Sequence, residues 1–110
     1  WAFDPQTKSW QSAVPGSEIE FEIVGTSIAL MWYRLREAMG KFRVAVDVTE
    51  VKETCDGWFP GTWGGYRETR IIAGGLQSCR HLVRVRVLPE SHPESTGHVC
   101  RILGLGSSLG

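Results

Sequence analysis

The chain has 110 residues, of which 42% are hydrophobic and 22% are charged, a composition typical of a folded domain rather than a disordered segment. This length is sufficient for one hydrophobic core, so we expect a single domain over residues 1–110. Twelve basic residues balance twelve acidic ones, which argues against a nucleic-acid partner. No apolar run approaches the roughly eighteen residues of a membrane span, and there is no basic amphipathic helix, so we expect no membrane partner either.

The chain begins with a polar segment between Trp1 and Trp10, for which we expect a structural role along one edge of the fold. It has no initiator methionine and no secretory signal at its start, so we expect a mature fragment or an excised domain.

Period-two alternation begins at residue 17 and predicts a half-buried strand over residues 17–24. Its inward residues would be Ile19, Phe21 and Ile23, with Glu18, Glu20 and Glu22 outward. After Gly25, residues 26–33 are apolar on both faces, as in a strand that is covered on both sides. Trp32 and Tyr33 point in opposite directions, so we expect one of the two rings to face the core.

The remaining elements are short. Residues 34–40 have helical propensity for at most a turn or two before Gly40. Further strands are predicted over residues 41–48, 69–74, 81–88 and 98–105. The inward residues of the first and third of these would be Phe42, Val44, Val46, Val48, Val83, Val85 and Val87. Pro89–Gly97 is polar and contains two prolines, which predicts an exposed loop.

Several short strands, frequent turn signals and no long helix predict an all-β fold, an antiparallel β-sandwich of jelly-roll type. The outward glutamates of residues 18–22 would then lie opposite basic residues of other strands and form cross-strand ion pairs. We favour a solvated sheet face over a binding patch there, because exposed ion pairs of this kind are common and weak.

No standard catalytic constellation is visible. The chain has no GxSxG segment, and its three histidines, His81, His92 and His98, do not follow the spacing of a metal or catalytic motif. We therefore expect that the domain is not an enzyme by itself and needs no cofactor. A structural Ca²⁺ occurs in many jelly-roll modules, but we identify no cluster of oxygen ligands for one.

The three cysteines, Cys55, Cys79 and Cys100, do not have the paired spacing of a zinc site. Two alternatives remain open: a bridge between Cys55 and Cys79, or three free thiols that pack as small hydrophobic residues.

The most unusual segment is Cys55–Arg70, which combines four aromatic residues with four glycines and a proline. Glycine and proline predict a loop, and aromatic rings on a loop suit the C–H faces of sugars, while charged side chains bind sugar hydroxyl groups. The candidate sugar-binding residues are Trp58, Trp63 and Tyr66 as platforms, with Asp56, Arg67, Glu68 and Arg34 as polar partners. The alternative is that the rings form a lid over the core.

Three stretches, Pro15–Leu30, Met39–Asp47 and Leu82–Gly106, resemble the non-catalytic β-sandwich domain of SGNH/GDSL-type carbohydrate esterases. The resemblance extends to Asp56, Gly57 and Trp58 of a "DGWW"-like segment, with Phe59 in place of the second tryptophan, and to the closing Gly97–His98 pair. The pattern of that family usually has a turn glycine directly after the residue that matches Asp47. This chain has Val48 there instead, so we expect the strand to run on or bulge past Asp47.

This resemblance implies a galactose-binding-like jelly roll with an accessory role. It carries over no catalytic residue. We therefore expect a carbohydrate-binding module that presents a polysaccharide or oligosaccharide to a catalytic domain, from an extracellular or secretory-pathway protein. The alternative is a structural docking domain that packs on its own esterase, in which case a partner protein would bury the aromatic loop.

Overall fold

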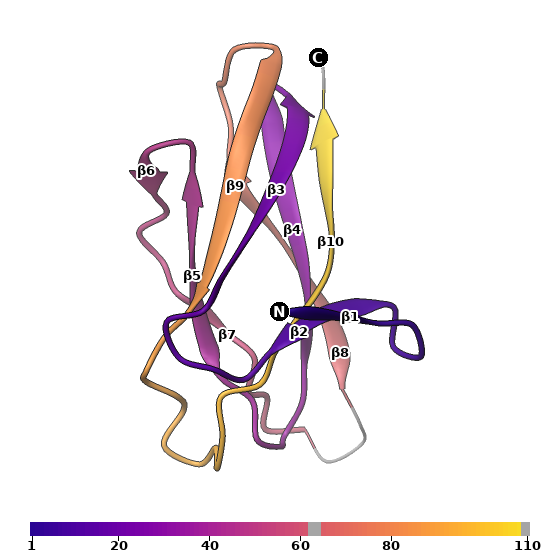
Figure 1. Cartoon of the computed structure of the whole chain (residues 1–110), viewed down its shortest axis with the longest axis vertical. Helices are drawn as coiled ribbons and strands as arrows, with labels where there is room; N and C mark the ends of the chain where they lie inside the picture. The colour runs from indigo at the N-terminus through magenta and orange to yellow at the C-terminus, as the bar shows by residue number, and fades with distance from the viewer. Residues whose placement is uncertain (62–64, 109–110) are drawn as a thin grey trace.

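The computed structural model describes residues 1–61 and 65–108, and over these ranges the chain forms strands and no helix. No helix of the length and hydrophobicity that crossing a membrane requires is found there. Figure 1 shows two antiparallel sheets packed face to face in a molecule of 40 × 26 × 25 Å. The strands are β1 (Ala2–Asp4), β2 (Ser9–Ser12), β3 (Glu18–Gly25), β4 (Ser27–Arg34), β5 (Lys41–Val46), β6 (Thr49–Glu50), β7 (Cys55–Asp56), β8 (Tyr66–Ala73), β9 (Cys79–Val87) and β10 (Cys100–Ser108).

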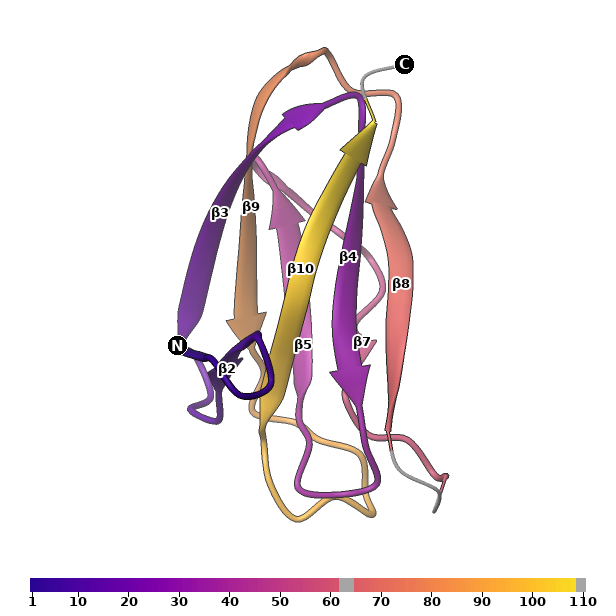
Figure 2. The same cartoon turned by 90° about the vertical axis from the view of Figure 1, so that its right-hand side faces the viewer.

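The strand order is that of a jelly roll. One sheet has the order β1-β2-β10-β4-β8, and the other has the order β3-β9-β5, with β6 and β7 both paired to β5. From β2 to β5, and again from β7 to β10, the chain crosses to the opposite sheet after each strand, and Figure 2 shows the first sheet from its outer side. This alternation is the connectivity of a double-sheet jelly roll. The predicted all-β antiparallel sandwich is confirmed.

The core lies between the two sheets and contains the inward residues that the alternation predicts. The buried residues of β5 and β9 are Phe42, Val44, Val46, Val83, Val85 and Val87, and β4 adds Ile28, Leu30 and Trp32. The inward residues of β3 are only half-buried, because β3 is an edge strand. The Trp32 ring packs edge-to-face on Phe42 at 5.6 Å, and its Nε1 donates a hydrogen bond to the backbone oxygen of Asp56. Of the Trp32–Tyr33 pair, Trp32 therefore faces the core.

Two local predictions are wrong. Val48, predicted to face inward, is 99% exposed. The chain turns before it: Asp47 has a φ of 56° and Val46 pairs with Thr49, so β5 and β6 form a two-residue hairpin instead of a strand that runs on or bulges. A short polar side chain tolerates this left-handed conformation better than most residues.

The second wrong prediction is the helical turn over residues 34–40. Apart from a bond from the Met39 N–H to the Glu37 oxygen, the backbone groups of this segment bond to other segments. Leu35 N–H donates to the oxygen of Gly57, Phe59 N–H donates to the oxygen of Leu35, and Gly40 N–H donates to the oxygen of Val99. These bonds satisfy groups that a helical turn would pair internally, and they join three loops at one end of the sandwich.

Asp47 also anchors β9. Its carboxylate accepts hydrogen bonds from the Leu82 N–H at 3.0 Å and from Nδ1 of the buried His81 at 2.8 Å. The Leu82 bond first and the His81 bond second hold the pKa of Asp47 below its ordinary value. The bond to Asp47, and then the carbonyl oxygen of Gln77 at 2.8 Å from Nε2, raise the pKa of His81. Both ring nitrogens face acceptors, which favours the doubly protonated ring.

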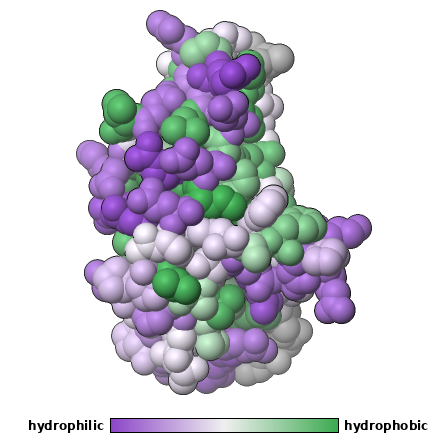
Figure 3. All heavy atoms as spheres, viewed as in Figure 1, coloured by the Kyte–Doolittle hydropathy of each residue, from purple (hydrophilic) through white to green (hydrophobic). Residues whose placement is uncertain are grey.

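The outer face of β3, β9 and β5 carries the predicted cross-strand ion pairs. Arg84 lies 3.8 Å from Glu18 and 3.5 Å from Glu20, and Arg80 lies 3.7 Å from Glu22. Figure 3 shows hydrophilic residues gathered over this part of the molecule. All these side chains are substantially exposed, so each pair contributes at most about 1 kcal/mol.

All three cysteines are free, so the bridge between Cys55 and Cys79 is not formed. Cys55 and Cys100 are buried among the core residues, whereas Cys79 is exposed. Burial raises the pKa of Cys55 to about 11 and that of Cys100 to about 12. Both are therefore protonated thiols that pack as small hydrophobic residues.

Candidate functional site

The structure places Trp58 in a lid rather than on the surface. Its ring is only 6% exposed, and it stacks on the His92 ring with 3.9 Å between centroids and 11° between planes. His92 belongs to the Pro89–Gly97 segment, which was predicted as an exposed loop but folds back at this point. In the same segment, the Ser95 hydroxyl donates a hydrogen bond to the backbone oxygen of Met39 at 2.5 Å. Both faces of Trp58 are thus unavailable to a sugar in this arrangement.

Arg34 holds the lid together from within. Its guanidinium donates to the Tyr66 hydroxyl and to the Trp58 backbone oxygen, each at 2.8 Å, and lies 3.7 Å from the Glu68 carboxylate. The same guanidinium lies against the rings of Phe59 and Tyr66, which pack edge-to-face at 4.5 Å. Arg34, Tyr66 and Glu68 therefore have partners within the fold.

Asp56 has a similar role at the start of the same loop. Its Oδ1 accepts the Trp58 N–H at 2.9 Å, and its backbone oxygen accepts Nε1 of Trp32. Trp63, the remaining predicted platform, lies outside the described residues. Of the predicted set, Arg67 has a different position from the rest, since it lies on the outer face of the sheet.

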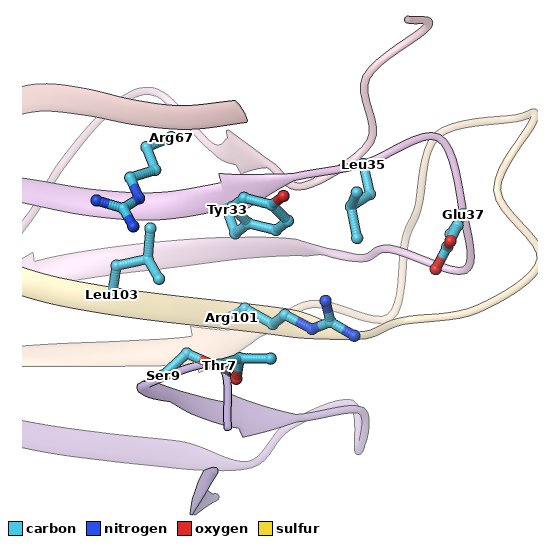
Figure 4. Close-up of a pocket in the computed structure, with 8 residues that line it drawn as sticks. All are labelled: Thr7, Ser9, Tyr33, Leu35, Glu37, Arg67, Arg101 and Leu103. Atoms are coloured by element: carbon cyan, nitrogen blue, oxygen red, sulfur yellow. Dashed lines mark hydrogen bonds between the residues drawn. The ribbon is translucent and has the colours of Figure 1, made fainter. Parts of the chain in front are cut away.

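The outer face of the first sheet contains a hollow of about 410 Å³. It is lined by Tyr33, Leu35, Glu37, Arg67, Arg101, Leu103, Thr7 and Ser9, and we call it the Tyr33 hollow. Figure 4 shows the Tyr33 ring in its middle, Arg67 and Leu103 toward one end, and Glu37 at the other. The side chain of Arg101 runs beside the ring toward Glu37. A volume of this size fits one or two sugar rings or a comparable small ligand.

The sheet register explains why these residues meet. Tyr33 of β4 pairs directly with Arg67 of β8, so both side chains leave the same face of the sheet. On the other side of β4, Arg101 pairs with Gln11 of β2 and points the same way as Tyr33, because Ile102 next to it is buried. Leu103, two residues after Arg101, leaves the same outer face, and the β10 register shifts directly beside it, between Ile102 and Gly104.

The β1–β2 hairpin forms a rigid polar wall of the hollow. Gln11 donates hydrogen bonds to Asp4, Thr7 and Ser9 at 3.0–3.1 Å, and the Thr7 and Ser9 hydroxyls bond each other at 2.7 Å. The Gln6 N–H first, and then the side chains around it, lower the pKa of Asp4. The Asp4 carboxylate is thus already bonded, and it does not line the hollow.

Arg67 and Arg101 have no partner among the residues that the structure describes, either as an ion pair or as a side-chain hydrogen bond. Six of the other seven arginines form ion pairs: Arg34, Arg43, Arg70, Arg80, Arg84 and Arg86. The seventh, Arg36, is exposed and lies outside the hollow. The Nε of Arg101 is buried without a hydrogen-bond partner, as are the Nε atoms of Arg34, Arg43 and Arg84, but those three arginines also form ion pairs.

The lining of the Tyr33 hollow suits the binding of a ligand. It offers one aromatic ring, two leucines and several polar groups, but no nucleophile beside a histidine. Over residues 1–61 and 65–108, no group of three or more His, Cys, Asp or Glu side chains lies close enough to hold a metal ion. We therefore describe the hollow as a candidate ligand site.

Sequence reasoning identified Arg67 and missed Tyr33, Arg101 and Glu37. The signal for Tyr33 was present in the sequence. Alternation along β4 puts Trp32 and Tyr33 on opposite faces, so if Trp32 faces the core, Tyr33 faces outward. No comparable signal existed for Arg101. It is far from Tyr33 along the chain, and the pairing of β4 with β10 brings the two residues together.

No protein-family model matches the chain, and no curated protein matches it significantly. Among solved structures, it is similar to a two-domain esterase (CEX) active on acetylated mannans, co-crystallized with mannopentaose, with a TM-score of 0.73 and 22% identity over 92% of this chain and 28% of that one. A Paenibacillus xanthan lyase has a TM-score of 0.70 and 11% identity over 99% of this chain and 11% of that one.

Both neighbours are carbohydrate-active enzymes, and the chain corresponds to less than a third of the length of either. At these identities the likeness shows the fold alone. It is compatible with the resemblance to an esterase-associated sandwich that the sequence indicates.

Proposed function

We propose that this chain is a non-catalytic carbohydrate-binding domain that holds a glycan in the Tyr33 hollow and presents it to an associated catalytic domain. The observation that carries the proposal is the combination of a tyrosine ring with two unpaired arginines in one hollow of a jelly roll. A sugar ring presents C–H groups on its faces and hydroxyl groups at its rim. The ring and leucines suit the faces, and the arginines and the exposed Thr7 hydroxyl suit the rim.

The position of the hollow supports the same proposal. It lies on the outer face of a sheet whose other face is the core, so a ligand can bind there without any rearrangement of the fold. The wall formed by the β1–β2 hairpin is hydrogen-bonded within itself, which lowers the entropy cost of binding. The glycan-processing enzymes among the structural neighbours make a carbohydrate the first ligand class to test.

The test is titration of the 110-residue protein with a panel of soluble glycans, including acetylated and deacetylated mannan and xanthan, by isothermal calorimetry and affinity electrophoresis. Tyr33→Ala removes the ring and should weaken binding about five- to thirtyfold, because the contact of a stacked ring contributes about 1–2 kcal/mol. Ile71→Ala is the matched control, since Ile71 is 73% exposed on the same strand as Arg67 and lies outside the hollow.

Retention of full affinity in Tyr33→Ala would place the binding site elsewhere. A folded protein that binds no glycan at all would overturn the proposal and favour the docking domain. In that case, mixing with an SGNH-type esterase should protect the outer face of β4 and β8 from amide hydrogen exchange.

A further inference from the structure

We infer that the Tyr33 hollow selects a glycan that bears a carboxylate, such as one containing a uronic acid. This inference rests on the proposed function and concerns the ligand class of the same site. It follows from the two arginines of the hollow, which form no ion pair, whereas six of the other seven arginines of the chain do.

The two guanidinium groups come from strands on opposite sides of β4. Arg67 is on β8 and is exposed, whereas Arg101 is on β10 and is partly buried, with its Nε inaccessible and unbonded. A cation that is removed from water without an anion beside it loses solvation energy, and proteins normally offset this with a paired carboxylate. At Arg101 no described carboxylate has that role.

The acidic groups near the hollow do not neutralise it. Glu37 is the one acid in its lining, and it is exposed and forms no ion pair with either arginine. The nearby Asp4 carboxylate is bonded to the hairpin, as described above. The lining therefore carries two cations and one anion, although the whole chain has no net charge.

Arginine suits a carboxylate because its planar fork donates two parallel hydrogen bonds to the two oxygens. A sugar ring that stacks on Tyr33 directs its substituents outward, toward Arg67 at one end of the hollow and toward Arg101, which runs beside the tyrosine ring (Figure 4). A carboxylate on the sugar ring would therefore lie next to a guanidinium and pair with it. A neutral hydroxymethyl group at the same ring position has no charge with which to form such a pair. Glu37 at the far end is free to accept hydrogen bonds from the hydroxyl groups of an adjacent residue.

The experiment compares uronic-acid polysaccharides with their carboxyl-reduced counterparts, which have the same backbone without the charge. We expect at least tenfold tighter binding of the acidic form, because hydrogen bonds between charged groups are worth about 1.5–3 kcal/mol. Raising the salt concentration from about 0.05 M to 0.5 M should weaken only the acidic form, since the screening length becomes shorter than the site.

Three variants identify the groups responsible. Arg67→Gln and Arg101→Gln should each reduce affinity for the acidic form about tenfold and affinity for the carboxyl-reduced form by clearly less, because that form loses only hydrogen bonds to neutral hydroxyl groups. Arg80→Gln is the control, because it removes the same charge from the ion-paired face of β9 and should have no effect. Arg101→Lys keeps the charge but not the fork, so a loss in this folded variant also supports the inference.

Equal affinity for acidic and reduced glycans, with binding still lost in Tyr33→Ala, would overturn the inference and leave the proposed function standing. Binding of sulfated glycans but not of carboxylated ones would also overturn it. Absence of binding to every glycan by folded protein would overturn both.

Discussion

Replacement of Trp58 by alanine tests whether the ring is a lid over the core or a platform that contacts a sugar. The Trp58 ring is 6% exposed and stacks on His92, so its removal leaves a cavity where three loops meet. Truncation of a buried tryptophan to alanine costs about 3–5 kcal/mol of unfolding free energy. For a domain of about 100 residues, 1 kcal/mol corresponds to roughly 4 °C in Tm, so Trp58→Ala should lower Tm by about 12–20 °C.

Urea denaturation followed by far-UV circular dichroism gives the unfolding free energy directly, with Ile71→Ala as an exposed control that should change it by less than about 0.5 kcal/mol. Glycan affinity, measured at a temperature where Trp58→Ala remains folded, should be unchanged. If this variant instead keeps its stability to within about 1 kcal/mol and loses glycan binding, the ring contacts ligand and our assignment of the lid is incorrect.

Two further predictions concern the scaffold. The hydrogen bond to Asp47 raises the pKa of His81. The stability that this bond contributes is therefore fully present below about pH 6.5 and is lost as the pH rises through the pKa of His81 in the folded protein. The hydrogen bonds that the Asp47 carboxylate accepts lower its pKa. The stability that these bonds contribute is therefore fully present above about pH 4 and is lost as the pH falls through the pKa of Asp47 in the folded protein. The stability difference between wild type and Asp47→Asn, from denaturation at a series of pH values, should therefore be largest between about pH 4 and 6.5; a difference that does not vary with pH would contradict this. For the thiols, Ellman's reagent at pH 8 should modify Cys79 rapidly in the folded protein and reach Cys55 and Cys100 only after denaturation, and fast modification of all three would contradict their burial.

The sandwich could be predicted because each long strand carries its own local signal. Alternation in residues 18–24, 41–46 and 81–87 assigns every side chain to a face without reference to any other segment. Burial then follows wherever two such faces meet. A period-two pattern does not determine where a strand stops, and this is why Val48 was assigned to the core. The turn depends on the backbone of Asp47 and on its bonds to β9, which the local pattern does not contain.

The lid could not be predicted for the same reason. Helical propensity in residues 34–40 is overruled by hydrogen bonds to Gly57, Phe59 and Val99, which are distant along the chain. Likewise, glycines before Tyr66 predicted a loop up to residue 68, but β8 begins at Tyr66 because its partner β4 supplies a full ladder of bonds. Composition alone showed that aromatic rings and charges gather in this region, but it could not assign them to the inner or the outer face.

The two faces of β4 divide the molecule into a part that maintains the fold and a part that is available to a ligand. Trp32 and Arg34 point inward, where Trp32 packs in the core and Arg34 fastens the lid. Tyr33, between them in sequence, points outward into the hollow. Because adjacent residues of a strand never share a face, substitutions at Tyr33 can change a ligand without creating a cavity in the core. The same geometry separates our tests: a variant that loses both stability and binding belongs to the inner face, whereas one that loses binding alone belongs to the Tyr33 hollow.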